Sequence, residues 1–101
     1  MLNLDAKYLN IICPLLAQYV PDMTVWAYGS RVNGQAHESS DLDLVVINTL
    51  HPDKPQVELL ALRQAFHDSH LPIRIDIHDW ARLSEHFRAE IKQQYEVIRF
   101  Y

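Results

Sequence analysis

Apolar residues recur at helical spacing over the first twenty positions of the chain, at Leu9, Ile12, Leu15, Leu16 and Tyr19. This spacing is close to the i, i+3, i+4, i+7 pattern of an amphipathic helix. Asp5 stands where the N-cap of that helix is expected, because its carboxylate can accept hydrogen bonds from the free N–H groups of the first turn. Pro14 lies inside the pattern and predicts a kink or a break, since proline removes one hydrogen bond and clashes with the preceding turn.

Three shorter segments have the residue pattern of β-strands, and they cover residues 24–28, 41–47 and 73–78. The second segment is apolar on both faces after Asp43, which predicts a strand that is buried on both sides except at its beginning. In the third segment isoleucines alternate with Arg74, Asp76 and His78, so one face of that strand is polar.

Two further helices are expected in the second half of the chain. Pro55 lies near the first turn of one that continues to about His67, and its inner side is predicted to consist of Val57, Leu60, Ala61 and Phe66. Asp79 can cap a short helical turn at Trp80. A last helix is then predicted from apolar residues at i, i+4 spacing, which are Leu83, Phe87, Ile91 and Tyr95.

The apolar end of the chain, residues 95–101, either adds an edge strand to the sheet or meets a partner. The predicted order of elements is α-β-(short helix)-β-α-β-α. This order indicates an α/β (α+β) fold in which a short mixed β-sheet is flanked by helices.

The composition is that of an ordinary globular protein with an acidic balance. The 101 residues, of which 49% are hydrophobic and 22% are charged, fit one domain spanning residues 1–101. The net charge is −4 and the nine Lys and Arg residues are scattered, so direct binding to nucleic acid is disfavoured. A single cysteine, no pattern of a secretory leader and no apolar run long enough for a bilayer predict a reduced, cytoplasmic protein without a membrane partner.

The first candidate for chemistry is the pair Gly29-Ser30, which follows the first predicted strand. Glycine lets a ligand approach the backbone closely, and Ser30 can cap the short helix that follows. The beginning of a helix offers unpaired N–H groups to a phosphate, and Arg31 adds a positive charge beside it. Gly29, Ser30 and Arg31 are therefore predicted to bind a nucleotide, although a serine that only caps a helix is the commoner use of such a pair.

The second candidate is a pair of acids at the beginning of the second strand. Asp41 and Asp43 are separated by one residue, which predicts carboxylates on the same face with their Cα atoms about 7 Å apart. Two such charges raise each other's pKa unless a cation neutralises them. Mg²⁺, held jointly with substrate phosphates, suits these hard oxygen ligands. An isolated pair of this kind is as often two solvated acids at an exposed strand end.

Asp76, on the polar face of the third strand, converges with this pair if the second and third strands are neighbours. Three carboxylates around two metal ions form the arrangement that in-line nucleotidyl transfer uses. Asp76 would then accept the proton of the attacking hydroxyl or position the ion that lowers its pKa. Asp79 is the rival, but strand parity places it on the opposite face. Asp41, Asp43 and Asp76 are therefore the predicted catalytic and metal-binding residues.

The chain resembles the minimal nucleotidyltransferase (MNT) family of the DNA polymerase β superfamily. The resemblance depends on Gly29-Ser30, ten intervening residues, Asp41-Leu42-Asp43, an apolar strand, and Asp76 within a later Ile-Asp-Ile. It covers the whole chain, and Arg31 and Gly34 match the variant Gly-Ser-Arg-x-x-Gly. It implies that Ser30 contacts the β- and γ-phosphates, that Asp41 and Asp43 hold both metal ions, and that Asp76 completes the site.

The resemblance also implies a partner and a reaction. Members of this family are commonly antitoxins paired with a helical HEPN-domain ribonuclease, and similar antitoxins use ATP and Mg²⁺ to attach AMP to a tyrosine hydroxyl of the toxin. The implied protein is an adenylyltransferase that forms a hetero-oligomer with its toxin. Two alternatives stay open: an antitoxin that neutralises its partner by binding alone, and transfer of a nucleotide to a small molecule, which would need extra structure to hold the acceptor.

Overall fold

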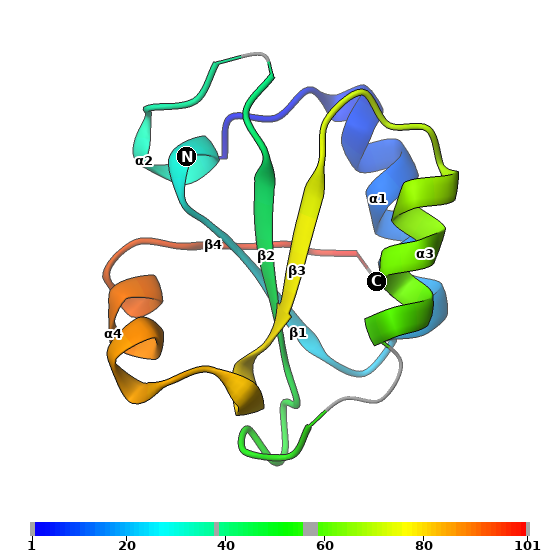
Figure 1. The fold of residues 1–101 in the computed structure, drawn as a ribbon. Coiled ribbons are helices and arrows are strands. Elements are labelled where there is room, and N and C mark those ends of the chain that lie inside the picture. Colours follow the sequence, from blue (N-terminus) through cyan, green and yellow to red (C-terminus); the bar gives the residue numbers. More distant parts are fainter. Residues whose placement is uncertain (1, 38, 56–58, 101) are drawn as a thin grey trace.

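The centre of the molecule is a four-stranded sheet with the strand order β3-β2-β1-β4 (Figure 1). The computed structural model describes residues 2–37, 39–55 and 59–100. Its strands are β1 (Thr24–Tyr28), β2 (Leu42–Ile47), β3 (Ile75–Asp79) and β4 (Glu96–Val97). β1 is antiparallel to both β2 and β4, whereas β2 and β3 are parallel. The expected short mixed sheet is therefore confirmed.

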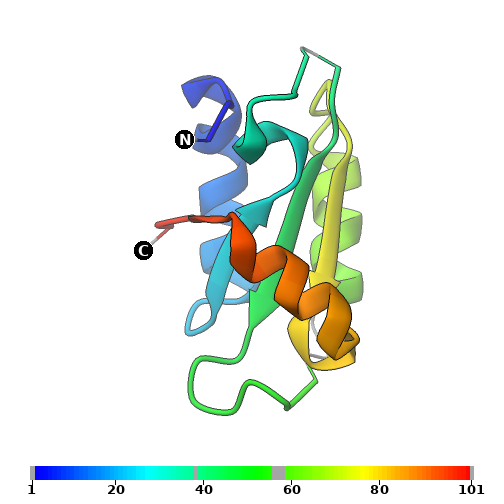
Figure 2. The ribbon, with the colours of Figure 1, turned by 90° about the vertical axis from the view of Figure 1, so that its left-hand side faces the viewer.

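Helices cover both faces of this sheet (Figure 2). α1 (Ala6–Tyr19) and α3 (Leu59–Asp68) lie side by side on one face, and the 3-10 helix η1 (Trp80–Arg82) and α4 (Glu85–Gln93) lie on the other. α2 (Ser30–Asn33) is a single turn at the end of β1. No helix among the described residues is both long and apolar enough to cross a bilayer.

Alternation along the strands divides the apolar side chains between two cores. Ala27 and Leu44 belong to the larger core beneath α1 and α3, whereas Tyr28 and Val45 belong to a smaller core with Trp80 and α4. β2 is buried on both faces after Asp43, as the sequence predicted. The beginning of β2 is therefore the place where a polar side chain can reach the surface of the sheet.

α1 begins as the sequence predicted. The Asp5 carboxylate accepts a hydrogen bond from the Lys7 N–H at 2.9 Å. α1 is continuous through Pro14, so the helix does not break there. Pro14 and Asn10 are both exposed, and water can therefore satisfy the Asn10 carbonyl that loses its partner to the proline.

The inner face of α3 differs from the prediction. Leu59, Leu62 and Phe66 are buried, whereas Leu60 is 76% exposed and Ala61 is exposed as well. Residues 59–62 are four consecutive apolar residues, so spacing alone does not determine which of them face the core. Val57, which was also predicted on this inner face, lies outside the described residues, as does Tyr101 at the end of the chain.

The last helix is shorter than its apolar spacing suggested. Ser84 caps α4 by accepting a hydrogen bond from the Phe87 N–H at 3.1 Å, and Gln94 has extended backbone angles, so Leu83 and Tyr95 lie outside the helix. The residues after it form the edge strand β4, which pairs with β1, and Ile98 continues into the larger core. Of the two expectations for the apolar end, the edge strand is confirmed.

Candidate active site

Three side chains lie in a row across the sheet, on the face that α4 covers. Tyr28 is opposite Asp43 in the register of β1 and β2, and Asp43 is beside Asp76 in the register of β2 and β3. Neighbouring strands are about 4.8 Å apart, so the two acids are immediate neighbours. The adjacency of the second and third strands, on which the predicted convergence depended, is present.

Asp41 lies outside this row. β2 begins at Leu42, one residue later than expected, so Asp41 precedes the strand. Its side chain is exposed, and its negative charge still acts on Asp43. Among the described residues, no three His, Cys, Asp or Glu side chains are grouped closely enough to hold a metal ion by themselves. The structure thus brings two of the predicted acids side by side and leaves the third at the entrance of the strand. A cluster of all three stays a prediction.

The negative charges near the row of Tyr28, Asp43 and Asp76 perturb the pKa values of its members. The pKa of the Asp43 carboxyl is raised above its ordinary value, first by burial and then by the charges of Asp76 and Asp41, against which His78 and Arg74 act. The pKa of the Tyr28 hydroxyl is raised as well, first by burial and then by Asp43 and Asp76. A bound cation would relieve this repulsion.

Gly29 connects the row to α2. Its backbone has φ 79° and ψ −154°, a conformation found essentially in glycine alone. A Cβ placed on Gly29 would lie 2.5 Å from the Asp43 Oδ2, so any other residue would displace that carboxylate. The absence of a side chain at Gly29 therefore leaves room for the acid and opens the backbone to a ligand.

Ser30 is the first residue of α2, and Gly29 takes the cap position that the sequence assigned to the serine. The N–H groups of Val32 and Asn33 both donate to the Gly29 carbonyl at 3.0 Å. The first N–H groups of a helix have no partner within it, and Ser30 stands at that end. The predicted contact of Ser30 with a phosphate stays a prediction.

Arg31 has a structural role that its sequence position did not reveal. The side chain is only 5% exposed. Its Nε donates to the Ser40 carbonyl at 3.0 Å, and its two terminal nitrogens donate to the carbonyls of Asn3 and His37 at 2.9 and 3.4 Å. Arg31 thus ties α2 to the loop that leads into Asp41. Its predicted contact with a nucleotide stays a prediction.

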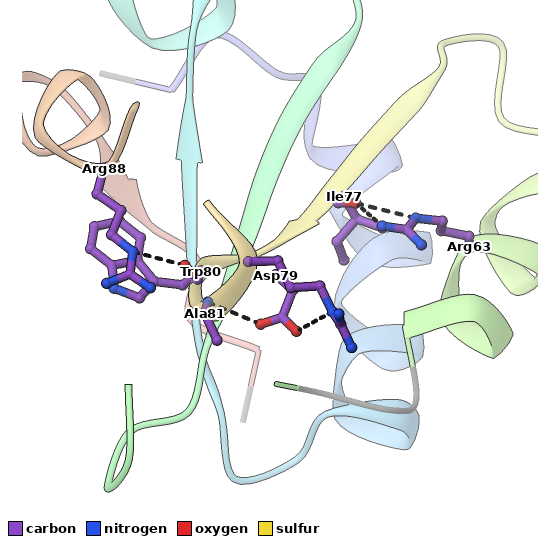
Figure 3. A network of polar contacts seen from close by, with 7 residues as sticks. Arg63, Ile77, Asp79, Trp80, Ala81 and Arg88 are labelled. Atoms are coloured by element: carbon purple, nitrogen blue, oxygen red, sulfur yellow. Dashed lines mark hydrogen bonds and ion pairs between the residues drawn. The ribbon is translucent and has the colours of Figure 1, made fainter. Parts of the chain in front are cut away.

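The two acids on β3 have separate roles. The Asp79 carboxylate caps η1 by accepting from the Ala81 N–H at 3.2 Å, and it pairs with Arg82 at 3.4 Å (Figure 3). It is 4% exposed and belongs to the other end of the strand. Asp76 instead pairs with Arg74, whose Nε lies 3.0 Å from the Asp76 Oδ1 and whose side chain is 73% exposed. The choice of Asp76 over Asp79 from strand parity therefore agrees with the structure.

A cavity of about 520 Å³ opens beside the row, between α2 and α4. Its lining includes Tyr28, Gly29 and Asn33, at the end of β1 and in α2, and Phe87 and Gln93 of α4. The sequence pattern placed Tyr28 at the end of a strand and Phe87 in the apolar spacing of the last helix, and it did not single out Asn33 or Gln93. No signal in the sequence could have found this cavity, because it depends on how α4 crosses the sheet.

The acids fit a divalent cation. Mg²⁺ is usually held by one or two carboxylates together with water and substrate phosphates, so a cage of three protein carboxylates is not required. Asp43 and Asp76 provide two neighbouring carboxylates, and Gly29 gives a phosphate close access to them. This arrangement can bind a metal-bound phosphate ester and present it to a hydroxyl group.

Comparisons with known proteins agree with this geometry. Residues 10–99 match the family described as "Polymerase beta, Nucleotidyltransferase". The chain is 46% identical over 101 aligned residues to the "Probable protein adenylyltransferase MntA" of Haemophilus influenzae (strain ATCC 51907 / DSM 11121 / KW20 / Rd), an alignment that covers 97% of this chain and 84% of that protein.

Two solved structures have a similar fold. One is the crystal structure of a toxin–antitoxin with AMP-PNP, to which the chain is 21% identical with a TM-score of 0.71, covering 92% of this chain and 73% of that one. The other is an MntA-HpeT toxin–antitoxin mutant in which two aspartates are replaced by glutamates, with 19% identity, a TM-score of 0.70, and coverage of 92% of this chain and 73% of that one. At these identities the similarity shows a shared fold.

Proposed function

The chain belongs to the polymerase beta nucleotidyltransferase family, and from this premise we propose that it is a Mg²⁺-dependent protein adenylyltransferase that acts as an antitoxin. In this proposal it transfers AMP from ATP to a tyrosine hydroxyl of a HEPN-domain toxin and forms a hetero-oligomer with it. The observation that carries the proposal is the placement of Asp43 beside Asp76, next to Gly29 and Ser30. The 46% identity to a protein named as a probable protein adenylyltransferase supports AMP as the transferred group.

Two neighbours in fold support the antitoxin role. Both are toxin–antitoxin complexes, and one contains AMP-PNP, an analogue of ATP. In the other, the two substituted aspartates are separated by one residue, as Asp41 and Asp43 are in this chain.

Each residue of the site has a separate task in this reaction. Ser30, at the beginning of α2, would bind the β- and γ-phosphates, while Asp43 and Asp76, with Asp41 at the strand entrance, would hold the cation. When bound, Mg²⁺ supplies positive charge that offsets the charge of the triphosphate and of the acids. The tyrosine oxygen attacks the α-phosphorus, the bond to the bridging oxygen breaks, and pyrophosphate leaves. Asp76 would accept the proton of the tyrosine hydroxyl directly or position the ion that lowers the pKa of that hydroxyl.

A protein acceptor suits the open side of the site. β3 is an edge strand, so Asp76 lies at the border of the sheet, and the Arg74 side chain beside it is largely exposed. An acceptor hydroxyl carried by a partner can therefore approach Asp76 from outside the sheet.

The test uses the protein, MgCl₂, each nucleoside triphosphate and the partner toxin, followed by measurement of both intact masses. We expect the mass of the toxin to increase by one or more AMP groups, and only with ATP. Asp43→Asn and Asp76→Asn should abolish the increase, whereas Asp22→Asn, at an exposed turn away from the site, should not change it.

Two results would overturn the proposal. If Asp41→Asn and Asp43→Asn both leave neutralisation of the toxin intact, the protein acts by binding alone. If the toxin mass never changes while a small molecule gains a nucleotide, the acceptor is not a protein.

A further inference from the structure

We propose that the cavity between α2 and α4 receives the purine base of the nucleotide, and that Gln93 and Asn33 recognise its edge. The proposal rests on the proposed function, because it takes a nucleoside triphosphate as the substrate. It adds a specificity site to the row of acids and assigns roles to two residues outside the sequence motif.

The cavity lies next to the acids, because two of its lining residues, Tyr28 and Gly29, are neighbours of Asp43. Tyr28 faces Asp43 across the strands, and Gly29, whose missing side chain borders the Asp43 carboxylate, lines the same cavity. A nucleotide with its phosphates at Gly29 therefore has its nucleoside within reach of this space. The volume of about 520 Å³ lies within the range of roughly 300–1,000 Å³ that is typical of small-molecule sites.

The cavity and the edge where the acceptor hydroxyl would enter lie on different sides of Asp43. Asp76 lies on β3 at the border of the sheet, Asp43 lies on β2, and the cavity begins at the end of β1. In an in-line displacement the attacking hydroxyl and the leaving group lie on opposite sides of the phosphorus. With the acceptor entering beside Asp76, the pyrophosphate leaves toward the β1 side, where Gly29 and Ser30 lie. The nucleoside on the same α-phosphorus is then within reach of the cavity that Gly29 lines.

One wall of the cavity is aromatic. The Phe87 ring packs edge to face against Tyr28 with centroids 5.9 Å apart, and it lies 6.3 Å from the His78 ring. These contacts hold Phe87 in place, while part of its surface faces the cavity. A planar base can stack on such a ring, a contact that is favourable for every base and fixes its plane.

Gln93 of α4 and Asn33 of α2 add amide groups to the lining. The described residues give Gln93 no hydrogen-bond partner, and its side chain is exposed at the end of α4. The Asn33 Oδ1 accepts from the Gln35 N–H at 3.0 Å, which leaves its amide nitrogen to donate. A carboxamide both donates and accepts, as the amino group and adjacent ring nitrogen of adenine require.

Gln94, which follows α4 as its C-cap, and Glu90 within α4 also line the cavity. The Gln94 Nε2 donates to the Val32 carbonyl at 3.4 Å and so joins α4 to α2 across the cavity. Glu90, the acidic residue at the cavity, is 3.2 Å from His86. The amides of Gln93 and Asn33 therefore keep donors or acceptors that no hydrogen bond among the described residues uses, and we assign the reading of the base to them.

The experiment compares ligands with and without a base. Isothermal titration with MgCl₂ would measure the affinity of the protein for ATP, CTP and inorganic tripolyphosphate. We expect ATP to bind more tightly than the other two. Gln93→Ala and Asn33→Ala should each weaken ATP binding about fivefold to tenfold, as the loss of one hydrogen bond predicts, and leave tripolyphosphate binding unchanged. The matched control is Gln18→Ala, at an exposed position of α1 on the far face of the sheet.

Three outcomes are decisive. If the wild type binds ATP and tripolyphosphate equally well but still transfers AMP to the toxin, the base does not occupy the cavity and only this inference fails. If Gln93→Ala raises the KM for the toxin without changing ATP affinity, the cavity holds the acceptor and the inference fails as well. If the wild type binds no nucleotide and modifies no toxin, the proposed function itself fails.

Discussion

Replacing Gly29 with alanine should damage both the stability and the activity of the protein. The backbone of Gly29, with φ 79° and ψ −154°, costs a residue that has a Cβ about 1–3 kcal/mol. A Cβ there would also lie 2.5 Å from the Asp43 Oδ2, and the carboxylate would have to move by about half an ångström to reach the 3.0 Å that real Cβ atoms keep. Because a misplaced reacting group can cost about a hundredfold in rate, we expect AMP transfer to fall by one to two orders of magnitude.

Gly34→Ala is the matched control for this substitution. Gly34 also has a positive φ, of 84°, but a Cβ there would meet no atom within 4 Å. It should therefore cost only the strain of a left-handed backbone, about 1 kcal/mol, and leave AMP transfer unchanged.

The assay is urea denaturation of both variants, combined with the rate of AMP transfer. In a domain of this size each kcal/mol corresponds to about 4–8 °C in Tm, so thermal melting gives an independent measure. A double-mutant cycle with Asp43→Ala separates the two causes, since removal of the carboxylate should reduce the penalty of Gly29→Ala to its backbone part. Equal losses of stability and equal activities for Gly29→Ala and Gly34→Ala would refute the reasoning.

Two further predictions concern charged residues of the site. The pKa of Asp43 is raised in the folded protein. Between the ordinary and the raised pKa, the native state therefore binds more protons than the unfolded chain. The free energy of unfolding falls as the pH rises through that window. In urea denaturation without metal, Asp43→Asn should be more stable than the wild type at pH 7, and the difference should disappear below the ordinary pKa of an aspartate; a constant difference at every pH would contradict this. Arg31→Ala should destabilise the fold by roughly 1–3 kcal/mol, because it leaves the buried Ser40 carbonyl and its neighbours without their donor. Arg31→Lys should recover only part of this loss in the same measurement, since lysine lacks the planar fork of donors, and full recovery would show that charge alone suffices.

Local patterns were sufficient to predict which acids of the second and third predicted strands lie side by side. Strand alternation placed Asp76 and Asp79 on opposite faces, and the structure agrees, because Asp79 caps η1 while Asp76 lies beside Asp43. The spacing of Gly29 and Ser30 from Asp41 and Asp43 indicated the family before any contact was known. Strand alternation and motif spacing depend only on residues that are close in the sequence, so the sequence is sufficient to predict them.

Features that depend on packing between distant segments could not be predicted in this way. The inner face of α3 was misassigned because Leu60 and Leu62 are equally apolar, and only the position of the helix over the sheet decides which one is buried. The burial of Arg31 depends on carbonyls from two other segments. The cavity beside Gly29 requires α4 to lie across from α2, which no local spacing specifies.

The outer border of β3 affects whether the protein associates with its own copies at high concentration. Arg63 reaches from α3 to this border, where its Nε and Nη2 donate to the Ile77 carbonyl at 3.2 and 2.8 Å (Figure 3). A bare row of carbonyls and N–H groups at a sheet edge recruits strands from other molecules, and a cation placed on it discourages that growth. Arg63 thus protects the strand that carries Asp76 from polymerising with its own copies. Removal of that arginine should therefore show first as turbidity at high concentration, before any loss of catalysis.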